Sequence, residues 1–229
     1  MGKVEGMNNP WEEISLSDYE KHMSLDSVMQ LQGMNQMMKG QFASYPVTSA
    51  MVLGVAGGNG LEHVDIQKYL KVYGIDINAD YLSVVKIRHQ NLKDILECLC
   101  IDLANEVDKL PRADLLIANL LIEYIGYERF QKAVEQVTPL YVSCIIQINT
   151  DEEQWVSDSP YLHAFDRLDE IHHQISEDGL NGCMEQMQFG LIKRVETVLP
   201  NGKKLIQMDY GRSIPAFRTD ALQGADIAL

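Results

Sequence analysis

The stretch from Met51 to Asp76 constrains the fold of this chain more than any other part of its sequence. It begins with the apolar run MVLGVA, passes through Gly57-Gly58-Asn59-Gly60, and closes a second strand-like run on the acid Asp76. A buried strand that opens through glycines into a helix places backbone N–H groups against an anionic or zwitterionic ligand. An acid one strand–helix–strand unit later stands where a ribose is held. The stretch therefore predicts an α/β fold that binds a nucleoside-containing cofactor.

After the first 45 residues, strand-like and helical runs alternate along the chain. The strand-like runs are mostly continuous and apolar, as in parallel strands that are covered on both faces. Five such strands are expected, at residues 50–55, 70–75, 95–101, 114–119 and 140–148. Helices are expected after Asn78, which can act as an N-cap, around Phe130–Val137, and from Ser159 to Ile175.

The end of the chain changes character. Phe189–Leu199 and Lys203–Tyr210 are strand-like and are joined by Pro200-Asn201-Gly202, which predicts a hairpin. The expected fold is a three-layer, Rossmann-like α/β sandwich with a seven-stranded, mostly parallel sheet that ends in this antiparallel hairpin. The residues after Gly211 show no clear periodicity.

The N-terminal part is expected to form a helical cap. Ser17 and Glu20 form a capping box, which predicts a helix from about Asp18. A second helix is expected over Leu25–Gln41, where apolar residues recur at spacings of three and four. We therefore divide the chain into a cap at 1–45, a cofactor-binding domain at 46–211 and a C-terminal tail at 212–229.

Composition and charge argue against several classes of function. The chain has 229 residues and a formal net charge of -14, and binding to nucleic acid needs clustered Lys and Arg. The sequence contains neither an apolar run of ~18 residues nor a hydrophobic leader. Three of its four cysteines, Cys98, Cys100 and Cys144, lie in apolar runs and are expected to be reduced core residues. We expect a cytoplasmic protein with no nucleic-acid or membrane partner.

Two cofactor classes compete for the glycine loop. A dinucleotide site reads G-x-G-x-x-G/A, but Gly58 and Gly60 are followed by His63, where Gly or Ala is needed for close helix packing. A terminal antiparallel hairpin is also unusual for the six-stranded dinucleotide fold. His63 is expected either at the cofactor or on the flank of a helix that begins near Leu61 and directs its positive end at the ligand.

The motifs, taken in order, point to the other class. They are VLGVAGGNG at Val52–Gly60, VYGID at Val72–Asp76, CIDL at Cys100–Leu103 and DLLIANLLIEY at Asp114–Tyr124, followed by the hairpin. They resemble, over residues 47–210, the motifs of the class I S-adenosylmethionine-dependent methyltransferases. Two positions depart from that family: Gly54 stands where an acid is usual, and Ala56 where the first glycine is usual.

The resemblance implies a role for each matching residue. Asp76 would bind both ribose hydroxyls, Asp102 would approach the adenine amino group, and Asn119 and Leu120 would border the methionine part. The remaining cofactor contacts are expected at Tyr19, Ala56, Gly57, Gly58, Gly60, Ile77 and Leu103. The segment with Tyr19, His22 and Met23 is similar to segments that fold over the cofactor in some small-molecule methyltransferases; an ordinary helix packed on the domain is the alternative.

The reaction that the resemblance implies is methyl transfer from S-adenosylmethionine to a nucleophilic atom. The protein then needs mainly to align the acceptor and to exclude water. If the acceptor must lose a proton, His22, Glu123 and Tyr124 are the candidate bases. No metal is required, and His172-His173 would point ~100° apart on a helix.

The acceptor is expected to be a small molecule, with a protein side chain as the other possibility. The fourth motif is not N-P-P-Y, which argues against amide nitrogens of DNA or protein glutamine. The alternatives to a methyltransferase are an S-adenosylmethionine-binding regulatory protein without turnover and a nicotinamide-dependent oxidoreductase.

Overall fold

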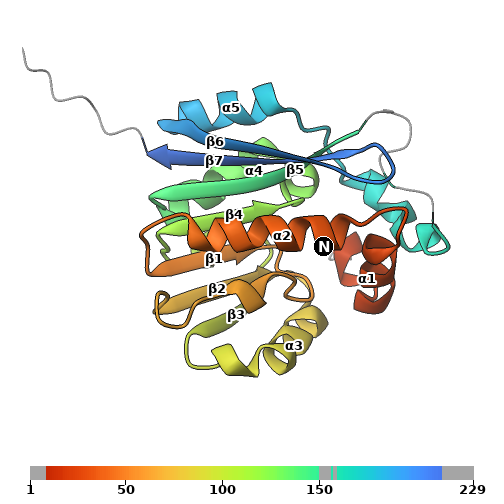
Figure 1. Ribbon diagram of the computed structural model, residues 1–229, viewed down its shortest axis with the longest axis horizontal. Coiled ribbons are helices and arrows are strands. Elements are labelled where there is room, and N and C mark those ends of the chain that lie inside the picture. Colours follow the sequence, from red (N-terminus) through yellow and green to blue (C-terminus); the bar gives the residue numbers. More distant parts are fainter. Residues whose placement is uncertain (1–8, 150–155, 157–158, 213–229) are drawn as a thin grey trace, which may run out of the picture.

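A seven-stranded sheet forms the centre of the molecule (Figure 1). The computed structural model describes residues 9–149, 156 and 159–212. The strand order is β3-β2-β1-β4-β5-β7-β6, with β7 antiparallel to both β5 and β6 and the other pairs parallel. The strands are β1 (Ser49–Leu53), β2 (Lys71–Asp76), β3 (Leu96–Cys100), β4 (Leu115–Asn119), β5 (Tyr141–Ile148), β6 (Phe189–Val198) and β7 (Lys204–Arg212). The predicted fold class is confirmed.

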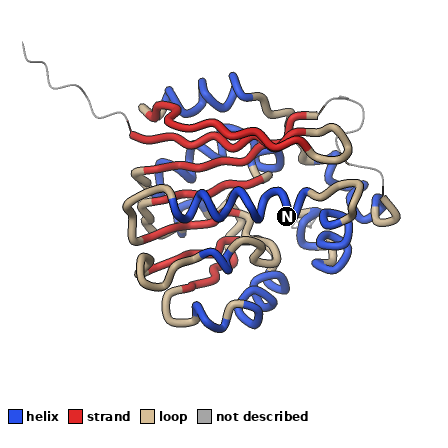
Figure 2. Tube along the Cα trace, in the orientation of Figure 1, coloured by secondary structure: helices blue, strands red, loops and turns tan. Residues whose placement is uncertain are grey.

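Helices cover both faces of this sheet (Figure 2). On one face, Met38 and Phe42 belong to a core cluster that includes side chains of β1. On the other face, Phe130 and Val134 belong to a second core cluster. The α-helices are α1 (Leu16–Ser24), α2 (Gln30–Ala43), α3 (Ala79–Arg88), α4 (Ile122–Val137) and α5 (Glu177–Gln186). Short 3-10 helices are η1 (Pro10–Glu12), η2 (Leu61–His63), η3 (Gln90–Leu92), η4 (Val107–Lys109) and η5 (Leu162–Glu170).

The helix expected after the glycine loop is absent, and that prediction was wrong. Only η2 follows Gly60, and the chain then turns at Asp65, whose side chain accepts a hydrogen bond from the N–H of Gln67 at 2.8 Å. The space on this sheet face is taken by α2, since Phe42 packs in the same cluster as Leu61. The loop therefore presents no helix N-terminus to a ligand.

The prediction between β5 and β6 also needs correction. The segment expected as one helix to Ile175 is η5, which ends at Glu170. A separate helix, α5, begins after Ser176, whose hydroxyl accepts a hydrogen bond from the N–H of Gly179. Two glycines within α5 obscured its sequence signal, because glycine lowers helix propensity.

The N-terminal segment has the two predicted helices with different bounds: the second, expected over Leu25–Gln41, spans Gln30–Ala43. The N-cap of α1 is Ser15, which accepts from the N–H of Asp18, and not Ser17. The division into cap, domain and tail stays a prediction, and residues 213–229 of the tail lie outside the described residues. Cys100 is exposed because β3 is an edge strand, so its expected core position was wrong.

No helix within the described part of the chain is long and apolar enough to cross a membrane. The cytoplasmic location stays a prediction.

Candidate active site

A cavity of about 460 Å³ lies at the carboxyl ends of the parallel strands and is also lined by residues of η1 and α1. In open α/β sheets ligands bind at this edge, and the volume is in the range of small-molecule sites. The predicted cofactor residues that line it are Tyr19, Ala56, Asp76, Ile77, Asp102, Leu103, Asn119 and Leu120, together with the candidate base Tyr124. The fold therefore places most of the predicted site residues around one cavity.

Asp76 ends β2 with its carboxyl group almost fully buried. One oxygen, Oδ2, accepts from the N–H of Ala56 at 2.8 Å, and Oδ1 accepts from the N–H of Asn78 at 2.9 Å. Burial raises the pKa of this carboxyl, while the backbone donors oppose the shift. Each oxygen keeps a lone pair, since a carboxylate has about four acceptor sites. Asp76 can therefore hold the glycine loop and still accept two ligand hydroxyls.

Asp102 follows β3 and lies at the same cavity. Its carboxylate caps its own turn, because it accepts from the N–H of Ala104 at 2.9 Å and from Asn105 Nδ2 at 2.6 Å. The aliphatic side chains of Ile101 and Leu103 flank it and are buried. The strand end therefore offers a polar group between two apolar surfaces, as a planar base requires.

Asn119, the last residue of β4, is held from behind by α2. Its side-chain amide and that of Gln41 exchange two hydrogen bonds of 2.9 Å, and Gln41 also donates to the Ser143 hydroxyl at 2.8 Å. Gln41 is completely buried. This pairing fixes which side of the Asn119 amide faces the cavity. Leu120, next in the chain, has φ of 50°, a strained conformation of the kind that gathers at ligand sites.

The three glycines of the loop lie outside the cavity lining, unlike Ala56. Gly58 and Gly60 have φ of 84° and 88°, which favours glycine. A Cβ on either would meet protein side chains, His89 at 2.7 Å and Met38 at 2.5 Å. Their need for glycine thus comes from packing, and a direct cofactor contact by Gly57, Gly58 and Gly60 stays a prediction.

Gly54 explains one departure from the family pattern. It lines the cavity with φ of 66°, and a Cβ there would lie 3.0 Å from Leu121 Cδ1. A side chain at this position would be strained and crowded. The backbone conformation here therefore disfavours the acid that is usual at this position in the family that the sequence resembles.

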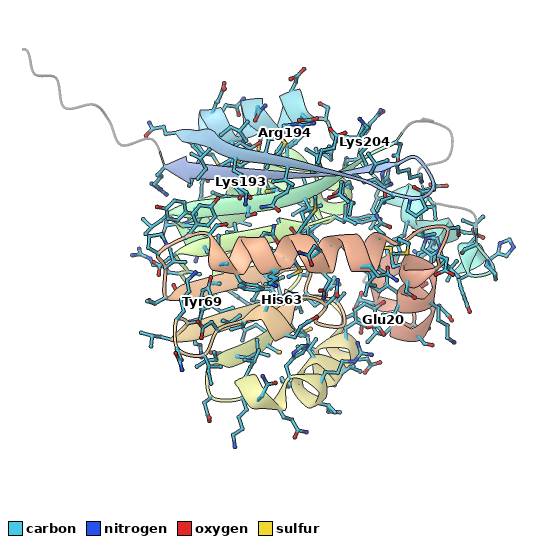
Figure 3. The ribbon with its side chains drawn as sticks, in the orientation of Figure 1. Glu20, His63, Tyr69, Lys193, Arg194 and Lys204 are labelled. Atoms are coloured by element: carbon cyan, nitrogen blue, oxygen red, sulfur yellow. The ribbon has the colours of Figure 1, made fainter. Side chains whose placement is uncertain are left out.

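The cap is fastened to the glycine loop by Arg88 of α3. Its guanidinium binds both carboxylate oxygens of Glu20 on α1, with Nη2 at 2.9 Å from Oε2, and Nη1 also donates to the Gly57 carbonyl at 3.1 Å. Figure 3 shows Glu20 on α1, and it labels His63 beneath α2, where Nε2 lies 2.9 Å from Asn35 Oδ1. His63 therefore lies on the α2 side and not at the cavity.

A second cavity of about 390 Å³ adjoins the first. The two share the side chains of Trp11, Tyr19, Leu120 and Tyr124 as lining residues. Trp11 packs edge-on against Tyr124, with ring centroids 4.9 Å apart, and against Tyr19 at 5.8 Å. These aromatic rings stand where the two cavities meet. The sequence pattern predicted no role for Trp11, Gln41 or Arg88.

The three candidate bases all line the second cavity. His22 Nδ1 lies 2.7 Å from the Ser159 hydroxyl, and burial together with the positive charge of Lys203 lowers its pKa. Burial raises the pKa of Tyr124 far above its ordinary value. Burial also raises the pKa of Glu123, to about 7. The raised pKa makes the Glu123 carboxylate a stronger base than an ordinary carboxylate.

No group of three His, Cys, Asp or Glu side chains within the described ranges is arranged to hold a metal ion. His172 and His173 lie in the loop before α5 and line the second cavity. The expectation that no metal is needed stays a prediction.

The chain is similar to known proteins in its three-dimensional structure. No protein-family model matches the chain, and no curated protein matches it significantly. Magnesium protoporphyrin IX methyltransferase from Synechocystis PCC 6803 with bound SAH superposes with a TM-score of 0.59 at 10% identity, covering 85% of this chain and 87% of that one. N-methyltransferase NodS from Bradyrhizobium japonicum WM9 with SAH gives 0.60 at 11%, covering 86% and 97%.

The chain has the class I methyltransferase fold. Many other solved structures share it, and not all are named as methyltransferases. The 4+2 cyclase SpnF superposes with a TM-score of 0.61 at 8% identity, covering 82% of this chain and 83% of that one. The class I fold by itself therefore does not fix the reaction, which has to be argued from the site.

Proposed function

We propose that this chain transfers a methyl group from S-adenosylmethionine to a small-molecule acceptor. The observation that carries the proposal is the buried Asp76 carboxyl at the end of β2, which opens into a cavity that also contains Asp102 and Asn119. Hydroxyl pairs on a ribose suit a carboxylate with two oxygens, and such charge-assisted bonds contribute roughly 1.5–3 kcal/mol each. The class I fold, and neighbours whose solved structures contain bound S-adenosylhomocysteine, add support.

Within this proposal the cavity residues divide by position along the cofactor. Asp76 and Ile77 hold the ribose, Asp102 and Leu103 border the adenine, and Asn119 and Leu120 border the methionine part. Tyr19 and Ala56 complete the enclosure, and Gly57, Gly58 and Gly60 are proposed as contacts of the loop. S-adenosylmethionine would supply a methyl group on a sulfonium sulfur that needs no further activation.

The chain's own residues would position the acceptor and exclude water. Trp11 and Tyr19 come from the cap and cover the first cavity, while Tyr124 separates it from the second. Alignment of this kind can provide much of the rate enhancement of a group transfer. Glu123 is our preferred base if the acceptor carries a proton, with His22 and Tyr124 as alternatives.

The acceptor is proposed to be small because it must fit the second cavity of about 390 Å³. Residues of α1, α4 and the loop before α5 line this cavity, whose size suits a small molecule. The net charge of -14 further disfavours nucleic acid. Two of the structural neighbours are named for small substrates: a magnesium protoporphyrin IX methyltransferase and a geranyl diphosphate methyltransferase. The cap, domain and tail boundaries and a cytoplasmic location complete the proposal.

Calorimetric titration with S-adenosylhomocysteine, S-adenosylmethionine and NAD tests the assignment. We expect micromolar affinity for both sulfur compounds and much weaker binding of NAD. Failure of both sulfur compounds to bind would contradict the proposal, and tight NAD binding would favour an oxidoreductase. Binding of S-adenosylmethionine without transfer to any acceptor would instead favour a regulatory protein.

A further inference from the structure

The second cavity holds a buried carboxylate oxygen that lacks a partner. Glu123, at the start of α4, is 7% exposed. Its Oε1 accepts from the N–H of Gln147 at 3.1 Å, whereas Oε2 is buried and has no hydrogen-bond partner among the described residues. An unsatisfied buried oxygen costs about 1–3 kcal/mol, and more when it is charged. A group that persists at such a cost in a cavity is a candidate ligand contact.

The rest of the cavity leaves the charge of Glu123 uncompensated. Its lining contains one carboxyl group and no lysine or arginine, as far as the described residues show. Burial lowers the pKa of His22 and of His172, so these two rings are neutral at neutral pH. An acceptor that is itself an anion would meet repulsion here, whereas a cation or an N–H donor would supply the missing partner.

Several polar groups of the lining are hydrogen-bonded to one another. Gln147 of β5 accepts from Gln30 Nε2 at 2.6 Å and donates to Asn149 Oδ1 at 2.6 Å, so the side-chain amides form a connected row. These amides donate and accept hydrogen bonds among themselves. Glu123 Oε2 is therefore the strongest hydrogen-bond acceptor that the cavity offers to a ligand.

Part of the cavity lining is apolar. Met23 of α1, together with Phe165 and Leu168 of η5, is buried and lines the cavity. These side chains give the greater part of a small ligand an apolar surface to contact, at roughly 25 cal/mol per Å² of surface removed from water. The cavity thus combines one carboxylate with an apolar chamber next to the proposed methyl donor.

We propose that the methyl acceptor is a small primary or secondary amine with an apolar body, whose nitrogen bonds to Glu123 Oε2 in the second cavity. This inference rests on the proposed function. The ammonium form enters as the partner of the carboxylate, and its proton passes to Glu123, which leaves the nitrogen lone pair free. That pair forms the N–C bond while the C–S bond breaks and its electrons stay on sulfur, giving S-adenosylhomocysteine and a methylated ammonium.

The test compares ligands that differ only in the polar group. Phenethylamine, phenylethanol and phenylpropionate would be titrated by NMR into the full-length chain, with and without S-adenosylhomocysteine. The amine should bind at least about tenfold more tightly than the alcohol and the carboxylate. Equal or tighter binding of the alcohol or of the carboxylate would overturn the assignment of an amine.

Variants locate the contact. Glu123→Gln keeps the shape and an oxygen for the Gln147 N–H but removes the charge, so amine affinity should fall at least about tenfold. Glu123→Asp keeps the charge and should retain part of the affinity. Glu135→Gln, at an exposed position of α4 beyond its kink at Gly126, is the matched control and should change nothing. Unchanged amine affinity in Glu123→Gln would overturn the inference, provided that thermal unfolding shows an intact fold.

The two proposals fail separately. Binding of S-adenosylhomocysteine should stay within twofold in Glu123→Gln, because Glu123 does not line the first cavity. If the amine binds the wild-type chain and S-adenosylhomocysteine does not, the proposed methyltransferase function is wrong and the proposed amine site is retained. If the sulfur compound binds and the amine does not, the methyl donor site remains and the acceptor class is wrong.

Discussion

A buried carboxyl group such as Glu123 affects stability as well as binding. Burial raises its pKa to about 7 from an ordinary 4.5, so between these values the folded chain holds a proton that the unfolded chain has lost. The contribution of Glu123 to stability therefore falls as pH rises through this window. The titratable groups around it are Tyr124 and Tyr127 on α4, Cys144 on β5, and Tyr19, His22, His172 and His173 at the cavity.

Glu123→Gln removes this titration and leaves the neighbouring groups in place. At pH 4.5 the variant and the wild type should be about equally stable, and at pH 8 the variant should be more stable by about 3 kcal/mol, from 1.36 kcal/mol per pKa unit. Urea unfolding at both pH values measures the difference. A gap that does not grow with pH would show that Glu123 is not buried as described.

Asp76 is the residue on which the cofactor assignment depends. Asp76→Asn keeps one oxygen for the backbone donors but removes the charge, so affinity for S-adenosylhomocysteine should fall at least about tenfold, or 1.4 kcal/mol. Calorimetry measures this change, with the exposed Asp108→Asn as a control that should bind normally. Equal affinity in the Asp76 variant would mean that the ribose site is elsewhere.

At the scale of elements, the cap helix α1 is attached by the pairing of Glu20 with Arg88, which also binds the Gly57 carbonyl. Arg88→Ala should cost little stability, since the pair is partly exposed. It should nevertheless speed the release of S-adenosylhomocysteine several-fold, because Tyr19 on α1 covers the cavity. Stopped-flow measurement of the dissociation rate tests this expectation.

Arg194→Ala provides the matched control for the Arg88 variant. Arg194 of β6 also makes a two-oxygen pair, with Glu177 of α5, far from the cap (Figure 3). This variant should release the ligand at the wild-type rate. If both arginine variants behave like the wild type, α1 does not control access to the cavity.

The elements differed in how far the sequence could predict them. The strands were found because continuous apolar runs such as β4 and β5 reflect burial on both faces. The helix after Gly60 was wrongly predicted because its absence depends on α2, whose Phe42 takes its place in the core. The helix propensity of one segment does not reveal that a helix distant in the sequence covers the same face of the sheet.

At the scale of the whole molecule, the site exists only where distant segments meet. Asp76, Asp102 and Asn119 could be predicted because each ends a strand, and parallel strands end at one edge of the sheet. Gln41 behind Asn119 could not be predicted, since it is 78 residues away and only the packing of α2 brings it there. The unpaired oxygen of Glu123 likewise follows from the meeting of α4, β5 and the cap.

The central claim is that the cavity at the strand ends holds the adenosyl part of S-adenosylmethionine. A crystal structure of the chain with S-adenosylhomocysteine tests it most directly. We predict both ribose hydroxyls within hydrogen-bond distance of the Asp76 carboxylate, the adenine beside Asp102, and the sulfur facing Tyr124 and the second cavity. A ligand bound with its ribose away from Asp76, or outside this cavity, would contradict the account.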